Sequence, residues 1–261
     1  MIVRDKTTDE NVEQDLEKSV DRKPKRNRYL VLVTGGKGGT GKSTFARGFL
    51  DVLRAHDIDV SAFDGDPSNS QLYRYYKGDG SGVSRIELGN RGEDILLDDI
   101  EQKTADVILV DIAAGGNQTL ANLEKSVRLL SNATEMGYQV VIVSVLSRIK
   151  DSVNLLRATM GMTAGHDVRH VAVKNLYFGE ADRFRLFDDS QTKERLLEDD
   201  GIVLNMPELS DDTYEALDQK NIPFRTAIQQ ESGLSLADRS RVFQWLQEFE
   251  DELRKSRGWL L

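Results

Sequence analysis

Short apolar runs alternate with longer amphipathic segments along the chain from Tyr29 onward. Runs that are apolar at nearly every position predict β-strands buried on both faces, and segments with apolar residues at helical spacing predict α-helices. The predicted strands cover residues 29–33, 59–63, 106–111, 139–146, 170–178 and a short run ending at 207. The predicted helices cover 42–56, 118–136, 152–160 and 235–255. This alternation indicates a doubly wound α/β fold, with a mostly parallel sheet and helices on both faces.

Residues 1–28 lack this pattern and are dense in charged residues, which predicts a disordered or marginally helical N-terminal tail. The 261 residues, 39% of them hydrophobic, are enough for one domain over 29–261 that ends in a long helix. No apolar run approaches the ~20 residues that a membrane-spanning helix needs, and the charged N-terminus is unlike a signal peptide. We therefore expect a cytoplasmic protein without a membrane partner.

Composition narrows the chemistry further. The chain has no cysteine, which excludes disulfides, thiolate metal sites, iron–sulfur centres and cysteine nucleophiles. The formal net charge of −9 means that DNA could be met only through a local basic patch. The end of the tail is a candidate for such a basic patch. The alternative is that its basic residues are simply solvated and bind no DNA. Its basic residues are Arg22, Lys23, Lys25, Arg26 and Arg28.

Residues 36–43 read GKGGTGKS and match the phosphate-binding pattern G-x-x-x-x-G-K-[ST], between a predicted strand and a predicted helix. The glycines let backbone N–H groups turn around a phosphate, and the helix start adds its positive dipole end. We expect Lys42 to bridge the β- and γ-phosphates, Ser43 to ligate Mg²⁺ and Thr44 to contact the α-phosphate. The predicted nucleotide-binding residues of this loop are Gly36, Lys37, Gly38, Gly39, Thr40, Gly41, Lys42, Ser43 and Thr44.

The general pattern does not account for Lys37, five residues before Lys42. With this second lysine, KGGTGKS resembles the deviant Walker A ATPases of the ParA/MinD group. The resemblance implies a homodimer formed on ATP, in which Lys37 reaches the partner's nucleotide as a catalytic cation. Cations supplied in this way accelerate phosphoryl transfer by ~10³- to 10⁵-fold. It also implies weak hydrolysis that an adaptor or activator protein stimulates.

Two further stretches resemble switch segments of the same family. In FDGDPSN (63–69) the resemblance implies that Asp66 orients or deprotonates the attacking water and that Asp64 helps to hold Mg²⁺ through its water shell. In VILVDIAAGG (107–116) it implies that Asp111 lies beside the metal. The family usually has proline two positions after this aspartate, where this chain has Ala113, so the second switch departs from the pattern.

Base recognition is carried by weaker similarities. VKNLYF resembles the family strand whose asparagine reads the adenine edge, which implicates Asn175, and the segment after LNMP resembles the loop that covers the base, which implicates Pro207. No [NT]-K-x-D guanine motif is present, because Lys174 is followed by Asn175 and Leu176. We favour ATP over GTP. The resemblance covers most of residues 29–236.

Within the group, iron–sulfur carriers are excluded by the absence of cysteine, and related tyrosine kinases by the absence of tyrosine after Tyr214. The remaining interpretation is a positioning or partition ATPase, most similar to plasmid partition and conjugative-transfer accessory ATPases of the StbB and TraL type. The alternative is a small-molecule ligase or kinase of the dethiobiotin-synthetase kind, which would need a dedicated substrate pocket. A protein that binds nucleotide without hydrolysing it is a third reading, against which Asp66 argues.

The last residues, RKSRGWLL, loosely resemble the membrane-targeting tail of the MinD branch. Because the segment is short and acidic residues precede it, we expect it to contact the body of the protein or a partner instead.

Overall fold

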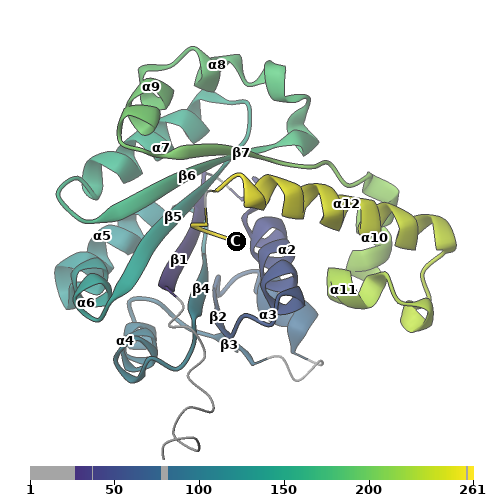
Figure 1. Cartoon of the computed structure of the whole chain (residues 1–261), viewed down its shortest axis with the longest axis horizontal. Coiled ribbons are helices and arrows are strands. Elements are labelled where there is room, and N and C mark those ends of the chain that lie inside the picture. The colour runs from purple at the N-terminus through teal and green to yellow at the C-terminus, as the bar shows by residue number, and fades with distance from the viewer. Residues whose placement is uncertain (1–26, 37, 78–81, 257) are drawn as a thin grey trace, which may run out of the picture.

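The computed structural model describes residues 27–36, 38–77, 82–256 and 258–261. Within them, seven parallel strands form one sheet in the order β3-β2-β4-β1-β5-β6-β7 (Figure 1). The strands are β1 (Arg28–Gly35), β2 (Val60–Gly65), β3 (Val83–Arg85), β4 (Val107–Ile112), β5 (Tyr138–Leu146), β6 (Val168–Asn175) and β7 (Ile202–Met206). The expectation of a doubly wound parallel sheet is confirmed.

The central strand β1 shows why the strands are apolar throughout. Leu30 and Leu32 face one hydrophobic cluster and Val31 and Val33 face another, because successive side chains of a strand point to opposite faces. All four are almost fully buried. Helices therefore cover both sides of the sheet, as in other parallel sheets.

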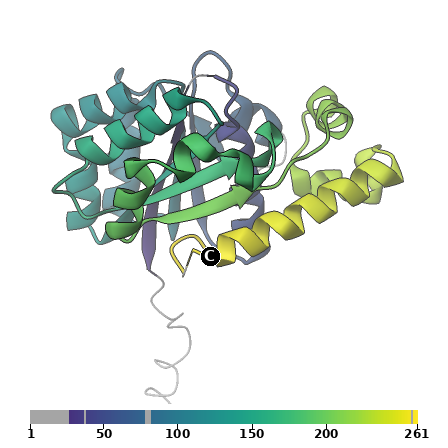
Figure 2. The same ribbon diagram turned by 90° about the horizontal axis from the view of Figure 1, so that it is seen from above.

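The face reached by Val31 and Val33 is covered by the helices after β1 and β2 and by C-terminal helices. These are α2 (Lys42–Ala55), α3 (Gln71–Tyr76), α10 (Asp211–Lys220), α11 (Phe224–Ala227) and α12 (Leu236–Arg254). Figure 2 shows α12 running from the edge of the sheet at β7 outward to α10 and α11. The short 3₁₀ turn η3 (Gln230–Ser232) precedes α12.

The opposite face carries the remaining described helices. They are α4 (Gly92–Gln102), α5 (Gly116–Val127), α6 (Leu129–Glu135), α7 (Lys150–Met162), α8 (Arg185–Asp188) and α9 (Gln191–Glu198), and two 3₁₀ turns, η1 (Leu176–Phe178) and η2 (Ala181–Arg183), lie between β6 and α8.

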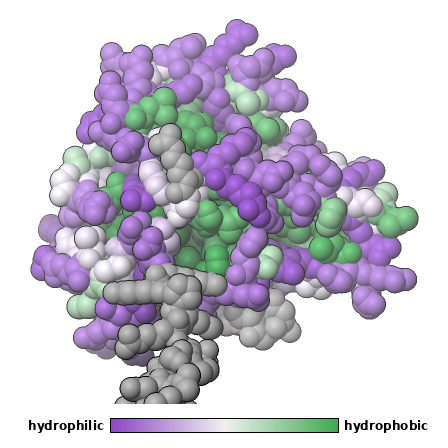
Figure 3. Space-filling model, viewed as in Figure 1, coloured by the Kyte–Doolittle hydropathy of each residue, from purple (hydrophilic) through white to green (hydrophobic). Residues whose placement is uncertain are grey.

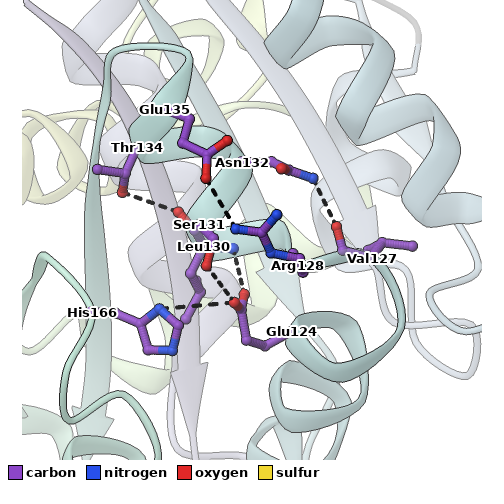
Figure 4. A network of polar contacts seen from close by, with 9 residues as sticks. All are labelled: Glu124, Val127, Arg128, Leu130, Ser131, Asn132, Thr134, Glu135 and His166. Carbon is purple, nitrogen blue, oxygen red and sulfur yellow. Dashed lines mark hydrogen bonds and ion pairs between the residues drawn. The ribbon is translucent and has the colours of Figure 1, made fainter.

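The single helix predicted over 118–136 is wrong, because two helices, α5 and α6, meet at Arg128. Arg128 has a left-handed backbone with φ of 51°, which ends α5. The Glu124 carboxylate then accepts hydrogen bonds from the Leu130 N–H and the Ser131 hydroxyl, both at 2.7 Å, and so caps the start of α6 (Figure 4). His166 Nδ1 lies 3.8 Å from the same carboxylate. Arginine favours helices, so composition gave no sign of this break.

The strand predicted over 170–178 is wrong at its end. Strand β6 stops at Asn175, whose side-chain oxygen accepts a hydrogen bond from the Tyr177 N–H at 3.1 Å and caps η1. A local side-chain acceptor of this kind turns the backbone out of the strand.

The described part of the C-terminal segment contacts the body of the protein, as expected. Leu260 is buried, its N–H donates to the Ser256 hydroxyl at 3.0 Å, and the Tyr29 hydroxyl donates to the Gly258 carbonyl at 2.9 Å. On the face of the molecule seen in Figures 1 and 3, hydrophobic residues gather at the centre, near the C-terminus. A hollow of about 420 Å³ there is lined by residues that include Tyr29 and Leu260. None of the helices among the described residues has the length and apolar character to span a bilayer.

Candidate nucleotide site

The carboxyl edge of the sheet brings the predicted motifs together. In the strand register, Asp64 of β2 lies opposite Asp111 of β4, and Val33 of β1 lies opposite the same Asp111. The glycine-rich loop leaves β1 at this edge, so three segments distant in sequence become neighbours. Ligands of doubly wound sheets bind at this edge, outside the carboxyl ends of the strands.

The loop between β1 and α2 is shaped by glycine and by one contact from β6. Gly41 precedes α2 with φ of 96°, a conformation that favours glycine, and a Cβ there would lie 2.4 Å from the Asn175 side-chain nitrogen. That nitrogen donates to the Thr40 carbonyl at 2.9 Å. The first turn of α2 holds no acidic residue and no side-chain cap, which leaves its N-terminus suited to an anion. Lys37 lies outside the described residues.

Asp111 is the most distinctive group of the site. It is 1% exposed, and within the described chain neither carboxylate oxygen has a hydrogen bond of ordinary geometry. Burial raises its pKa to about 7; the nearby Ser43 hydroxyl and Lys42 ammonium lower the pKa, and Asp64 and Asp66 raise it. A buried carboxylate without a partner is costly unless a cation reaches it. Carboxylate and hydroxyl oxygens are suitable Mg²⁺ ligands, so Asp111 and Ser43 together fit a magnesium ion.

The other two acidic residues are held by backbone donors. The Asp64 carboxylate accepts from the Asp66 N–H at 3.0 Å and from the Tyr73 N–H at 2.9 Å, and burial raises its pKa while these two bonds lower it. Asp66 Oδ1 accepts from the N–H groups of Ser68 and Asn69. Asp64 is therefore fixed in place, which suits a carboxylate that meets a metal through water, and Asp66 is presented toward the cavity.

One cavity of about 390 Å³ joins the loop to the later segments, a volume ordinary for a small-molecule site. It contains most of the predicted site residues. The wall from the front half of the chain, which we call the phosphate end, is formed by Gly38, Gly39, Gly41, Lys42, Ser43, Thr44, Asp66, Asn69 and Gln71. The lining from the later half of the chain, which we call the base end, consists of Asn175, Tyr177, Met206, Pro207, Leu209, Asp211, Tyr214 and Trp245.

Gly36, Thr40, Asp64 and Asp111 belong to the same region but not to the lining of this cavity. Thr40 holds Asn175 through its carbonyl. Ser43 of the cavity lining is near enough to Asp111 to lower the pKa of its carboxyl group.

Sequence reasoning missed most of the base end. The Trp245 indole N–H donates to the Pro207 carbonyl at 2.8 Å, and the ring stacks on Phe224 and Phe249 with centroids 4.7 and 4.9 Å away. The apolar spacing of Val242, Trp245 and Phe249 in α12 is the one local signal that Trp245 is buried, and it does not show that Trp245 supports this loop. Pro207 lines the same cavity as Lys42 and Ser43, and a role of its loop in covering a base stays a prediction.

Asn175 has two structural duties, since its amide donates to Thr40 and accepts from Tyr177. An amide has two donor hydrogens and two acceptor lone pairs. These two bonds therefore leave one donor hydrogen and one lone pair unused.

Comparisons with known proteins agree with this geometry. The family model described as the CobQ/CobB/MinD/ParA nucleotide binding domain matches residues 31–241. Protein MobD of Acidithiobacillus ferrooxidans is 26% identical over 222 residues, covering 85% of this chain and 94% of that protein. The narrower resemblance to the StbB and TraL type stays a prediction.

Two solved structures share the fold. The septum site-determining protein MinD of Pyrococcus horikoshii, complexed with Mg-ADP, has a TM-score of 0.52 at 17% identity and covers 90% of this chain and 99% of its own. A nucleotide-binding protein of Archaeoglobus fulgidus, in complex with ADP, has a TM-score of 0.51 at 15% identity and covers 83% of this chain and 93% of its own. With the family model matching most of its length, the chain belongs to the CobQ/CobB/MinD/ParA family of nucleotide-binding domains.

Proposed function

We propose that this protein is a ParA/MinD-like ATPase that binds Mg-ATP in the cavity at the carboxyl edge of the sheet and dimerises on ATP. It would act as a cytoplasmic positioning or partition switch, in plasmid stability or conjugative transfer. The observation that carries the proposal is Asp111, a buried carboxylate without an ordinary hydrogen-bond partner, beside Ser43 and Lys42. This arrangement suits a metal-bound triphosphate.

The residues divide the work of phosphoryl transfer among them. Lys42 and the N-terminus of α2 bind the phosphates, Thr44 contacts the α-phosphate, and Ser43 with Asp111 and Asp64 holds Mg²⁺. When bound, Mg²⁺ supplies positive charge against the charge that develops on the phosphate oxygens. Asp66 orients or deprotonates the attacking water, and Lys37 of a second copy adds a cation.

The base end of the cavity is where we place the adenine of the nucleotide. The adenine would lie between the Pro207 loop and Asn175, whose remaining amide hydrogen and lone pair can address one base edge. Two structures of the same fold, MinD of P. horikoshii and the A. fulgidus protein, were solved with ADP, one of them with magnesium. These likenesses support a nucleotide. The choice of ATP over GTP rests on the absent guanine motif.

Dimerisation is the part of the proposal that separates a switch from an ordinary enzyme. An ATP-dependent contact worth a few kcal/mol is enough to shift a monomer–dimer equilibrium decisively. Hydrolysis then returns the monomer, and an adaptor or activator protein sets the timing. DNA is a candidate partner, which would bind through its phosphates to a set of basic residues. They are Arg22, Lys23, Lys25, Arg26 and Arg28.

Light scattering after size exclusion tests the proposal, with wild type, Lys37→Ala and Lys42→Ala each measured without nucleotide, with ADP and with ATP. Lys125→Ala, an exposed lysine on α5, is the matched control. We expect wild type and the control to dimerise with ATP alone, Lys37→Ala to bind ATP but stay monomeric, and Lys42→Ala to bind poorly. Turnover is measured in parallel, with and without DNA.

The alternative, a small-molecule ligase or kinase, predicts the opposite pattern. A protein that stays monomeric in all nucleotide states, with full turnover in Lys37→Ala, would contradict the switch and favour that enzyme.

A further inference from the structure

The short helix α3 supports the phosphate end of the site. It follows the segment of Asp64 and Asp66 directly, and the Tyr73 N–H in its first turn donates to the Asp64 carboxylate at 2.9 Å. Gln71, its first residue, lines the nucleotide cavity. Helix α3 therefore supplies one of the two backbone N–H groups that hold the Asp64 carboxylate.

The other side of α3 is fastened to the base end by one carboxylate. The Arg74 guanidinium and the Tyr75 hydroxyl each donate to Asp218 Oδ1 at 2.5 Å. Asp218 lies on α10 one turn after Tyr214, which lines the base end. The side chains of Arg74 and Asp218 are 39% and 45% exposed, so solvent screens their ion pair. Tyr75 is 2% exposed and makes the better shielded connection.

A buried cation also contacts the ring of Tyr75. Arg47 of α2 is completely buried, and its guanidinium carbon lies 3.3 Å from the Tyr75 ring centroid and 4.4 Å from that of Phe224 in α11. Its Nε, Nη1 and Nη2 have no hydrogen-bond partner within the described chain. Aromatic faces, together with Asp51 one turn along the same helix, are what compensate this charge. Displacing the Tyr75 ring would remove the nearest of these partners.

Tyr75 is thus fixed at its ring by the helix that begins with Lys42 and Ser43, and at its hydroxyl by the helix that carries Tyr214. We infer that Tyr75, held by Arg47 and Asp218, is a positioning residue that couples the metal-side carboxylates to the base end of the cavity. The inference rests on the proposed Mg-nucleotide site. Coupling of this kind is reciprocal: occupancy of the base end favours the metal-binding arrangement of Asp64, and the metal favours the closed base end.

Tyr75→Phe is the sharpest test, because it removes the hydroxyl and keeps the ring over Arg47. Asp218→Asn is the conservative partner, since it keeps a side-chain oxygen that can still accept from Tyr75. Asp199→Asn is the matched control: it breaks another exposed acid–arginine pair, to Arg195 at 3.5 Å on the far face of the sheet. Equilibrium binding of ADP is measured for each protein over a range of Mg²⁺ concentrations and without metal.

We expect Tyr75→Phe to raise the Mg²⁺ concentration for half-maximal ADP binding by about 5-fold or more, the low end of ordinary coupling between sites. Its metal-free ADP affinity should stay within about 2-fold of wild type, since the phosphate loop and the base end are intact. The Mg²⁺ concentration for half-maximal ADP binding of Asp218→Asn should fall between those of wild type and Tyr75→Phe, and that of Asp199→Asn should match wild type. Hydrogen exchange at the amides of Leu72–Tyr76 should quicken in Tyr75→Phe in the absence of nucleotide.

Three results would overturn the inference. One is wild-type Mg²⁺ dependence in Tyr75→Phe. Another is a parallel loss of metal-free and metal-dependent affinity together with a lowered Tm, which would give Tyr75 a merely structural role. The third is a wild-type protein that binds no ADP, which would contradict the proposed function as well. Mg²⁺-dependent ADP binding in wild type, with the same dependence in Tyr75→Phe, would contradict the coupling alone.

Discussion

The two ends of the cavity are built by different means. The phosphate end comes from the loop between β1 and α2, the start of α2 and the segment from β2 to the start of α3. Its loop is fixed by backbone conformation, as with Gly41, and strand register places Asp111 next to it. The base end comes from side chains of β6, β7, α10 and α12 and is held by apolar contacts, with Trp245 at their centre. The phosphate end should therefore respond sharply to single changes, and the base end gradually.

Lys42→Ala is the severest test of the phosphate end. Lys42 is 6% exposed and lines the cavity, so in the proposed complex its ammonium would meet the phosphates where little water screens the charge. Removing one such charge should lower ATP turnover by about 10²- to 10³-fold. A steady-state phosphate-release assay measures this, with Lys125→Ala as control. Turnover within a few-fold of wild type would show that the phosphate end is placed wrongly.

Gly41→Ala changes the contact between the two ends of the cavity, where Gly41 lies against Asn175. The new Cβ would lie 2.4 Å from the Asn175 side-chain nitrogen, at a φ of 96° that L side chains rarely adopt. Strain and overpacking together should lower the free energy of unfolding by about 3 to 4 kcal/mol. Gly38→Ala is the matched control, because a Cβ there meets no atom within 4 Å. Equal urea midpoints for the two variants would contradict the described loop.

Asp51→Asn probes the buried support beneath the base end, where Asp51 accepts a hydrogen bond from the Arg225 N–H at 3.1 Å. Burial raises its pKa from 3.8 to about 6, while the Arg225 N–H, the Tyr76 hydroxyl and the Arg47 and Arg54 charges lower it. Because the folded-state pKa lies above the unfolded value, the stability that Asp51 contributes is complete below the unfolded pKa and is lost as the pH rises through about 6.

Asparagine removes this titration. The free energy of unfolding of the variant should therefore rise relative to wild type by up to about 3 kcal/mol between roughly pH 4 and pH 7. Urea titrations of both proteins at the two pH values measure it. A difference that does not change with pH would show that Asp51 has an ordinary pKa.

Trp245→Phe should give the smallest effect. Phenylalanine can keep the stacking on Phe224 and Phe249 but loses the bond to the Pro207 carbonyl. We expect a loss of about 1 kcal/mol, or about 5-fold in ADP affinity, measured by calorimetry. A loss as large as that of Lys42→Ala would mean that the two ends do not differ as described.

The same contrast explains what the sequence could predict. The loop of the phosphate end could be predicted because its glycines, lysine and hydroxyl lie at fixed spacing. Asp64 and Asp111 were implied by the family resemblance, and the structure places them opposite each other on neighbouring parallel strands. The fold class followed from strands such as β1, whose residues are buried on both faces.

Other features depend on contacts that no local pattern contains. The break at Arg128 requires Glu124 to cap the next helix, and the contact between Trp245 and Pro207 joins residues far apart in the chain. The burial of the Arg47 guanidinium could not be predicted from its own helix, because its partners Tyr75 and Phe224 come from later segments of the chain. Lys37, a central residue of the resemblance, lies outside the described residues.

Equilibrium binding of ADP to wild type and to Asp111→Asn, each with and without Mg²⁺, tests the account most directly. Asparagine keeps the size of the side chain and removes the negative charge that calls for a cation. We predict that Mg²⁺ tightens ADP binding to wild type and has no effect on the variant, whose metal-free affinity equals or exceeds that of wild type. Equal Mg²⁺ dependence in both proteins, or no ADP binding by wild type, would contradict a magnesium–nucleotide site at this edge of the sheet.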